Sequence, residues 1–139
     1  MASVNMTQKL SASADQVWGR IGDFGKLHEI HPAIEKTEME GGGVGSVRNL
    51  FLAGGGNVLE RLDEDDSAGR SYTYTILESP LPVANYQATI RAADNGDGTC
   101  TVHWSSKFDA DGAPDTEVEG IIQGIFQAGF DTWKSEFGG

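Results

Sequence analysis

The sequence has 139 residues, of which 38% are hydrophobic and 22% charged, a composition typical of a soluble globular protein with one hydrophobic core. Its formal net charge of −11 would repel nucleic-acid phosphates and anionic lipid headgroups, so we expect no nucleic-acid partner. No secretory leader and no apolar run near the roughly 18 residues of a membrane span are recognisable, so we expect one cytoplasmic domain over residues 1–139, monomeric or homodimeric.

The first predicted elements are a strand and a pair of short helices. Residues 3–12 alternate loosely between apolar and polar side chains, which predicts a half-buried strand. Ser13 and Gln16 have the spacing of a capping box, so a helix should start there, and residues 26–30 offer a second short helix. The residue before a proline avoids helical angles, which places His31 at the end of that second helix.

Strands and turns follow. Residues 79–85 contain two prolines and predict a bend or a sheet edge, and the Asp-Asn-Gly-Asp-Gly sequence at residues 94–98 predicts a tight hairpin turn. The lone Cys100 has no internal disulfide partner, and we expect a buried, inert thiol. Alternating side chains between the turn residues predict strands over residues 34–41, 46–53, 57–64, 70–78, 86–93 and 99–108.

The C-terminal segment, residues 115–137, returns to helical periodicity. Gly129 falls near the middle of its apolar face, where it either leaves space or lets backbone approach. A helix of this length spans roughly 35 Å and could cover the apolar face of an antiparallel sheet, with an internal cavity where the two do not fit closely. The predicted apolar face consists of Val118, Ile121, Ile122, Ile125, Phe126, Phe130, Trp133 and Phe137.

With these elements in this order, the chain resembles the helix-grip or Bet v 1-like (SRPBCC) superfamily and, within it, the bacterial polyketide cyclase/dehydrase-like proteins. The resemblance implies an α+β fold in which a curved antiparallel sheet of about seven strands, with two short helices after the first strand, wraps around a long C-terminal helix. It covers nearly the whole chain and rests on the segments SADQVWGRIGDFGKLHEIHPAI, GSVRNLFL, LERLDEDD, SYTYTILESPLPVANYQATIRA and TVHWSSKF.

The resemblance also implies a cavity between the long helix and the sheet, with a mouth near the short helices and the loops that connect the strands. Relatives of this type include lipid and hormone binders, cyclases and quinone-binding proteins, so the fold alone does not select an activity. At the lip of the cavity the resemblance would place Leu27, His28, Ile30 and His31.

Glu60 is the most informative polar position. It shares strand parity with Val58 and Leu62, so either Glu60 points into the core or the alternate residues Leu59 and Arg61 do. An inward Glu60 would need a cation to offset its burial, and Arg48 on the preceding strand is the candidate. Such a pair could orient a ligand or act as acid and base, whereas an outward pair would be a solvated cross-strand salt bridge.

Two further groups of side chains are candidates. His28 and His31 could share a helix face, as in some metal sites, but the sequence has no other metal-ligand spacing, so we expect no metal and no cofactor. His31 either forms a hydrogen bond at the lip of the cavity or simply ends the helix. His103 should face outward. The remaining ligand-binding candidates are Tyr72 and Tyr74, which share a face, together with Tyr86, Trp104, Phe126 and Gly129.

The leading interpretation is a protein that binds a small hydrophobic or aromatic molecule in the cavity between the sheet and the C-terminal helix. An alternative is a cyclase, dehydratase or lyase-type enzyme in which Glu60 and His31 move protons while Arg48 or a tyrosine stabilises an enolate. A second alternative is a partner-binding adaptor, which would need an exposed apolar patch. The same inward polar groups would serve binding and catalysis.

Overall fold

The computed structural model describes residues 2–139, which form a seven-stranded antiparallel sheet, two α-helices and one 3₁₀ helix. The order of the elements matches the order predicted from the sequence. The elements are β1 (Ala2–Leu10), α1 (Ala14–Ile21), η1 (Phe24–Glu29), β2 (Ile34–Glu40), β3 (Val47–Leu52), β4 (Asn57–Asp66), β5 (Ser71–Glu78), β6 (Val83–Asp94), β7 (Cys100–Ala110) and α2 (Asp115–Phe137).

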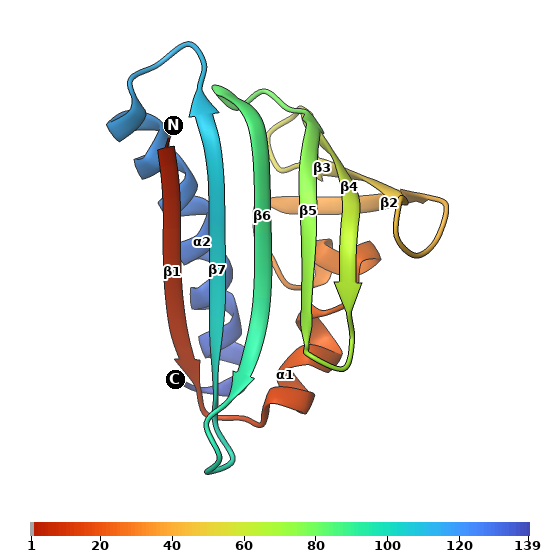
Figure 1. Ribbon diagram of the computed structural model, residues 1–139, viewed down its shortest axis with the longest axis vertical. Helices are drawn as coiled ribbons and strands as arrows, with labels where there is room; N and C mark the ends of the chain where they lie inside the picture. Colours follow the sequence, from red (N-terminus) through yellow and green to blue (C-terminus); the bar gives the residue numbers. More distant parts are fainter. Residues whose placement is uncertain (1) are drawn as a thin grey trace.

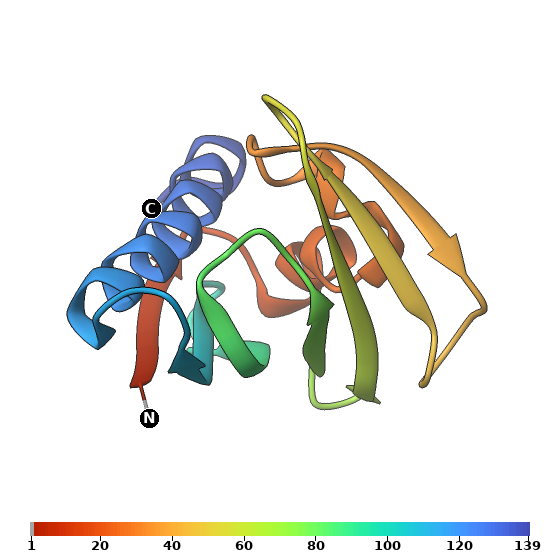
Figure 2. The same ribbon diagram turned by 90° about the horizontal axis from the view of Figure 1, so that it is seen from above.

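The strands lie in the order β1-β7-β6-β5-β4-β3-β2, and every neighbouring pair is antiparallel. The first strand therefore pairs with the last strand, and the last element, α2, also packs on β1 (Figure 1). Seen from above, the sheet is strongly curved, with α2 over β1 and β7 and with α1 and η1 on the same concave side (Figure 2). This arrangement confirms the predicted helix-grip fold.

The short helices begin where side chains satisfy their free backbone N–H groups. The Ser13 hydroxyl accepts a hydrogen bond from the Gln16 N–H at 3.2 Å, and the Gln16 side chain accepts one from the Ser13 N–H, which confirms the predicted capping box. The second helix is a 3₁₀ helix that begins at Phe24, earlier than predicted. Its start is fixed by Asp23, whose carboxylate accepts from the Gly25 N–H at 3.0 Å.

β6 also starts earlier than the sequence predicts. The strand begins at Val83, directly after the two prolines, instead of at residue 86. The pairing of β6 with β7 shifts register between Ala84 and Gln87, and this β-bulge explains the difference because it accommodates extra residues in β6. Within the bulge, Asn85 has a left-handed φ of 54°. The two prolines therefore lie just before β6. After the bulge, the Tyr86 side chain lies on the concave face of the sheet.

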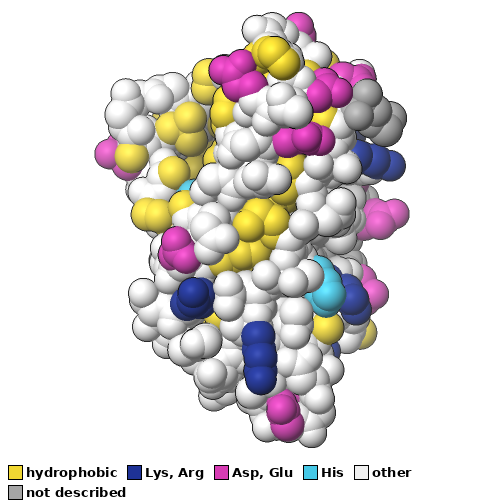
Figure 3. Space-filling view, turned by 90° about the vertical axis from the view of Figure 1, so that its left-hand side faces the viewer, with side chains coloured by type: hydrophobic (Ala, Val, Ile, Leu, Met, Phe, Trp, Pro, Cys, Tyr) yellow, Lys and Arg dark blue, Asp and Glu magenta, His cyan; other side chains and the backbone are white. Residues whose placement is uncertain are grey.

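α2 has the predicted bounds but buries a narrower apolar face than predicted. Because the helix packs mainly on β1 and β7, only the side toward these strands is covered, and Ile121 is 37% exposed. The side of the molecule on which β1 and α2 lie shows apolar side chains among scattered acidic groups (Figure 3). No helix in the described residues is both long and apolar enough to cross a membrane. The buried α2 residues are Val118, Ile122, Phe126, Gly129, Phe130 and Trp133.

Candidate ligand-binding cavity

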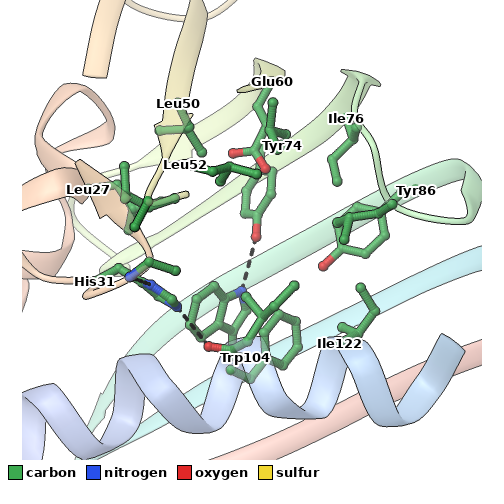
Figure 4. Close-up of a pocket in the computed structure, with 17 residues that line it drawn as sticks. Leu27, His31, Leu50, Leu52, Glu60, Tyr74, Ile76, Tyr86, Trp104 and Ile122 are labelled. Carbon is green, nitrogen blue, oxygen red and sulfur yellow. Dashed lines mark hydrogen bonds between the residues drawn. The ribbon is translucent and has the colours of Figure 1, made fainter. Parts of the chain in front are cut away.

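A partly enclosed cavity of about 220 Å³ lies between the concave face of the sheet and α2 (Figure 4). It exists because the curved sheet approaches α2 closely at β1 and β7 but diverges from it toward β3, β4 and β5. The wall residues are Leu27, His31, Ala33, Ile34, Leu50, Leu52, Ala53, Val58, Glu60, Tyr74, Ile76, Leu81, Tyr86, Trp104, Ile122, Ile125 and Phe126.

Glu60 points into the molecule, which resolves the two strand parities left open by the sequence. β4 buries Val58, Glu60 and Leu62, whereas Arg61 is exposed. Arg48 lies directly opposite Glu60 in the β3–β4 register. The exposed fractions are 1% for Arg48 and 6% for Glu60, so this is a buried ion pair and not a solvated salt bridge.

The ion pair is closely bonded and asymmetric. Arg48 Nε donates to Glu60 Oε1 at 2.8 Å, and Arg48 Nη2 lies 2.6 Å from the same oxygen. The third guanidinium nitrogen, Nη1, donates to the Phe24 carbonyl at 3.0 Å and lies 3.5 Å from the Tyr72 hydroxyl. The guanidinium carbon is 3.9 Å from the Phe24 ring centroid, a cation–π contact that further stabilises the buried charge.

Burial and the mutual attraction of the pair act in opposite directions on both groups. Burial raises the pKa of Glu60 above its usual value, and the charge of Arg48 reduces that rise without cancelling it. Burial has the largest single effect on Arg48 and would lower its pKa, but Glu60 together with Tyr72 and Tyr74 raises the pKa on balance, so the guanidinium stays charged. Glu60 is therefore a carboxyl group on the cavity wall that takes up a proton more readily than an exposed glutamate.

The tyrosines divide between the cavity wall and the interior. Tyr74 lines the cavity, and its hydroxyl accepts a hydrogen bond from Trp104 Nε1 at 3.1 Å; Tyr86 lines it as well (Figure 4). Burial raises the pKa of both hydroxyl groups, which keeps them protonated at neutral pH. Tyr72 and Arg48 do not line the cavity, contrary to the expectation that they contact a ligand, because they pack beneath α1 and η1 against Phe24.

His31 lines the cavity, but both of its ring nitrogens bond to the backbone. Nε2 lies 2.8 Å from the Ile125 carbonyl, and Nδ1 accepts from the Ala33 N–H at 3.1 Å. Burial lowers the pKa of the ring, which favours the neutral form. The predicted role of His31 in proton transfer is therefore not supported by this geometry, since neither nitrogen is free toward the cavity.

The two nearby histidines do not converge on one point. His28 Nδ1 lies 3.0 Å from the Thr37 hydroxyl, whereas His31 bonds to α2. Among residues 2–139, no three His, Cys, Asp or Glu side chains are grouped so that they could bind a metal ion.

Trp104 forms the floor of the cavity together with α2. Its ring stacks on Phe126, with 4.2 Å between centroids and an angle of 13° between the planes. Gly129 does not line the cavity: a Cβ at this position would lie 3.0 Å from Trp104 Cζ3 and 3.3 Å from His31 Cδ2. The absence of a side chain at Gly129 thus leaves room for the rings of Trp104 and His31. This corrects the expectation that Gly129 leaves empty space or lets another backbone segment approach α2.

Several apolar wall residues were not among the predicted site residues. Strand parity could have identified some of them, since Leu50 and Leu52 share the inward face of Arg48, and Ile76 shares that of Tyr74. No pattern in the sequence pointed to Leu81, which follows a proline in a loop.

The family model described as "Polyketide cyclase / dehydrase and lipid transport" matches residues 1–138. The chain belongs to this family. No curated protein sequence matches the chain significantly.

Solved structures share the fold. Protein XoxI from Bacillus cereus is 32% identical, with a TM-score of 0.94 and coverage of 99% of this chain and 96% of that one. The Zhui aromatase/cyclase from Streptomyces sp. R1128 is 22% identical, with a TM-score of 0.78 and coverage of 96% and 92%. Norcoclaurine synthase from Thalictrum flavum, in complex with dopamine and hydroxybenzaldehyde, is 23% identical, with a TM-score of 0.70 and coverage of 96% and 84%. At such identities the last two show a common helix-grip fold.

Proposed function

We propose that this protein binds a small hydrophobic or aromatic molecule in the cavity between the sheet and α2. The observation that carries the proposal is the composition of the wall, in which apolar side chains surround a few polar groups from Glu60, Tyr74 and Tyr86. Small-molecule sites are typically concave and mostly apolar, with a few polar groups that set the orientation of the ligand. The family description, which names cyclases, dehydrases and lipid transport, agrees with a cavity that accepts organic molecules.

The size of the cavity limits the ligand. An apolar protein cavity of about 150 Å³ accommodates benzene. The present cavity, at about 220 Å³, therefore suits one substituted ring or two small fused rings and is too small for a long acyl chain in its present shape. The norcoclaurine synthase neighbour binds single-ring compounds, which is consistent with ligands of this size on this fold.

A thermal-shift experiment tests the binding function. A ligand present at ten times its Kd stabilises the folded state by about 1.4 kcal/mol, which for a chain of this length corresponds to a Tm increase of roughly 5 °C. We expect one- and two-ring aromatic compounds to raise Tm by this amount and dodecanoate to raise it less. If no aromatic compound shifts Tm, the proposal is wrong.

Two neighbouring residues of β5 provide a matched pair of variants. Ile76 lines the cavity, whereas Leu77 faces outward and is 44% exposed. Ile76→Trp should fill part of the cavity and abolish the ligand-induced shift, while Leu77→Trp should leave the shift in place. Equal shifts in the two variants would mean that the compounds bind elsewhere.

We propose proton-transfer catalysis as a second candidate function, favoured by the carboxyl group of Glu60. A buried carboxyl with a raised pKa, adjacent to a fixed cation, is the kind of group that serves as a general acid or base. Such a group would accelerate removal of a proton next to a carbonyl in a bound ketone.

The two-ring ketone 1-indanone in D₂O is a suitable probe for this second function. We expect the protein to speed deuterium incorporation next to the carbonyl about 10²-fold or more over buffer, as measured by NMR. Glu60→Gln should abolish the acceleration, and replacement of the exposed Glu64 on the same strand by Gln should not. Exchange at the buffer rate would exclude this reaction and leave the binding function standing.

A further inference from the structure

We propose that the molecule bound in the cavity carries a neutral hydroxyl donor, as a phenol or an enol does, and that this hydroxyl binds Oε2 of Glu60. The inference rests on the proposed binding function and specifies the chemical class of the ligand for the same site.

The two carboxylate oxygens of Glu60 have different surroundings. Both Arg48 contacts, at 2.8 and 2.6 Å, end on Oε1. Arg48 is in turn fixed by its 3.0 Å bond to the Phe24 carbonyl and by its position over the Phe24 ring. The carboxylate can therefore not rotate without losing this ion pair. Among the described residues, none donates a hydrogen bond to Oε2, and this oxygen is not fully buried. Because Glu60 lines the cavity, a molecule bound there would meet an acceptor with an open position.

A ligand that covers Oε2 separates this oxygen from solvent. An ionised carboxylate only accepts hydrogen bonds. A ligand without a donor would leave a charged oxygen buried and unpaired, whereas a ligand hydroxyl would form a charge-assisted hydrogen bond. The difference corresponds to about a 10- to 100-fold change in affinity between a hydroxylated compound and an isostere that lacks the hydroxyl.

A neutral donor suits this position better than a cation does. Arg48 already supplies the positive charge that balances Glu60, and it is almost completely buried. A ligand ammonium group would bring a second positive charge next to Arg48 and would lose its own hydration on entry. The other polar groups of the wall add no charge to offset it, because Tyr74 and Tyr86 are neutral hydroxyls and burial lowers the pKa of His31, which favours its neutral form. A phenolic or enolic hydroxyl avoids both costs.

A comparison of 2-naphthol with 2-methylnaphthalene tests the inference, because a methyl group has nearly the size of a hydroxyl. We expect the wild-type protein to bind 2-naphthol at least about 10-fold more tightly, as measured by calorimetry or tryptophan fluorescence. A cavity without an acceptor gives the opposite order, since the methyl compound is more hydrophobic and a buried hydroxyl without a partner is costly.

Two variants connect this preference to Glu60. In Glu60→Gln, the amide oxygen must face the Arg48 donors, so the NH₂ group faces the cavity as a donor, and the ratio of the two affinities should fall about 10-fold or more. If that variant does not fold because Arg48 loses its counter-charge, the double replacement Arg48→Met with Glu60→Leu substitutes an apolar pair and should reverse the order of the two compounds.

The outcomes separate this inference from the function on which it depends. If both compounds bind the wild-type protein and 2-methylnaphthalene binds equally well or better, the hydroxyl inference is wrong and the binding function stands. If neither binds, both are wrong. If 2-naphthol binds more tightly but both variants retain the same ratio, the hydroxyl meets a group other than Glu60 and the inference is also wrong.

Discussion

The imidazole of His31 connects the segment before β2 to the middle of α2, because its Nε2 lies 2.8 Å from the Ile125 carbonyl while its Nδ1 accepts from the Ala33 N–H. These two partners fix the tautomer: Nε2 must carry the proton and Nδ1 must be free of one. Protonation of Nδ1 would remove the acceptor and place a charge in a buried position.

This arrangement predicts that the protein loses stability on mild acidification. The pKa of His31 is lowered in the folded state from its usual 6.5, so below that pH the unfolded chain binds a proton that the folded chain does not. The contribution of neutral His31 to the free energy of unfolding is fully present above about pH 6.5. It is lost as the pH falls, with a slope of at most about 1.4 kcal/mol per pH unit. Urea unfolding between about pH 5 and pH 7.5 measures it.

Comparison of two variants separates the effect of His31 on the pH dependence of stability from the effects of other titrating groups. His31→Gln has an amide that can still donate to the Ile125 carbonyl but does not titrate, so its stability should depend less on pH than that of the wild type. His103→Gln, on the outward face of β7, should keep the wild-type dependence. Identical pH profiles for wild type and His31→Gln would contradict the prediction.

The buried ion pair predicts a strongly non-additive double-mutant cycle. Arg48→Met leaves the Glu60 carboxylate buried without its cation and should cost about 3–5 kcal/mol of unfolding free energy. Arg48→Met combined with Glu60→Leu removes both charges and should cost less than the single variant. Chemical denaturation of the wild type, both single variants and the double variant gives the coupling energy; additive effects would show that the pair contributes no coupling.

The sequence predicted the order of the elements because each element carries a local signal, and the family resemblance supplied their arrangement as a helix grip. The capping box at Ser13 and Gln16, the Asn-Gly turn before β7 and the helical periodicity of α2 depend only on neighbouring residues, and all three occur as predicted. The narrower buried face of α2 has a tertiary cause. Ile121 is on the apolar side of α2 by sequence, yet it is exposed because the curved sheet does not reach it.

The site was predictable only in part, for a related reason. The sequence named Glu60 as a candidate, but strand parity alone left its orientation open, and the register that places it opposite Arg48 is a property of the folded hairpin. Which inward residues reach the cavity depends on where α1 and η1 cover the sheet. Tyr72 and Tyr74 share a face, yet only Tyr74 lines the cavity.

The three tyrosines of the chain predict a coupled alkaline transition. Tyr72, Tyr74 and Tyr86 are each only 3% exposed, and burial raises the pKa of each above the usual value of 10.0. The folded state therefore keeps its phenolic protons, and stability is retained below about pH 10 and lost above it, at up to about 1.4 kcal/mol per pH unit for each tyrosine. Tyrosinate absorbance should rise only together with the loss of circular dichroism. A rise in the still-folded protein would contradict this, and unfolded protein in denaturant should titrate near pH 10.

Two glycines of α2 predict substitutions of opposite sign. Alanine is favoured over glycine inside a helix by about 0.5–1 kcal/mol, and at Gly124 nothing lies within 4 Å of the added Cβ, so Gly124→Ala should stabilise the protein by about that amount.

At Gly129 the same methyl group would lie 3.0 Å from Trp104 and 3.3 Å from His31. Neither ring can retreat freely, because Trp104 stacks on Phe126 and His31 is bonded to the backbone on both sides. The destabilisation from overpacking, about 1–3 kcal/mol, is then larger than the stabilisation from the helix preference for alanine. Gly129→Ala should therefore have a lower Tm than the wild type, while Gly124→Ala has a higher one. Equal shifts in calorimetry would mean that the rings yield and that helix propensity alone decides both substitutions.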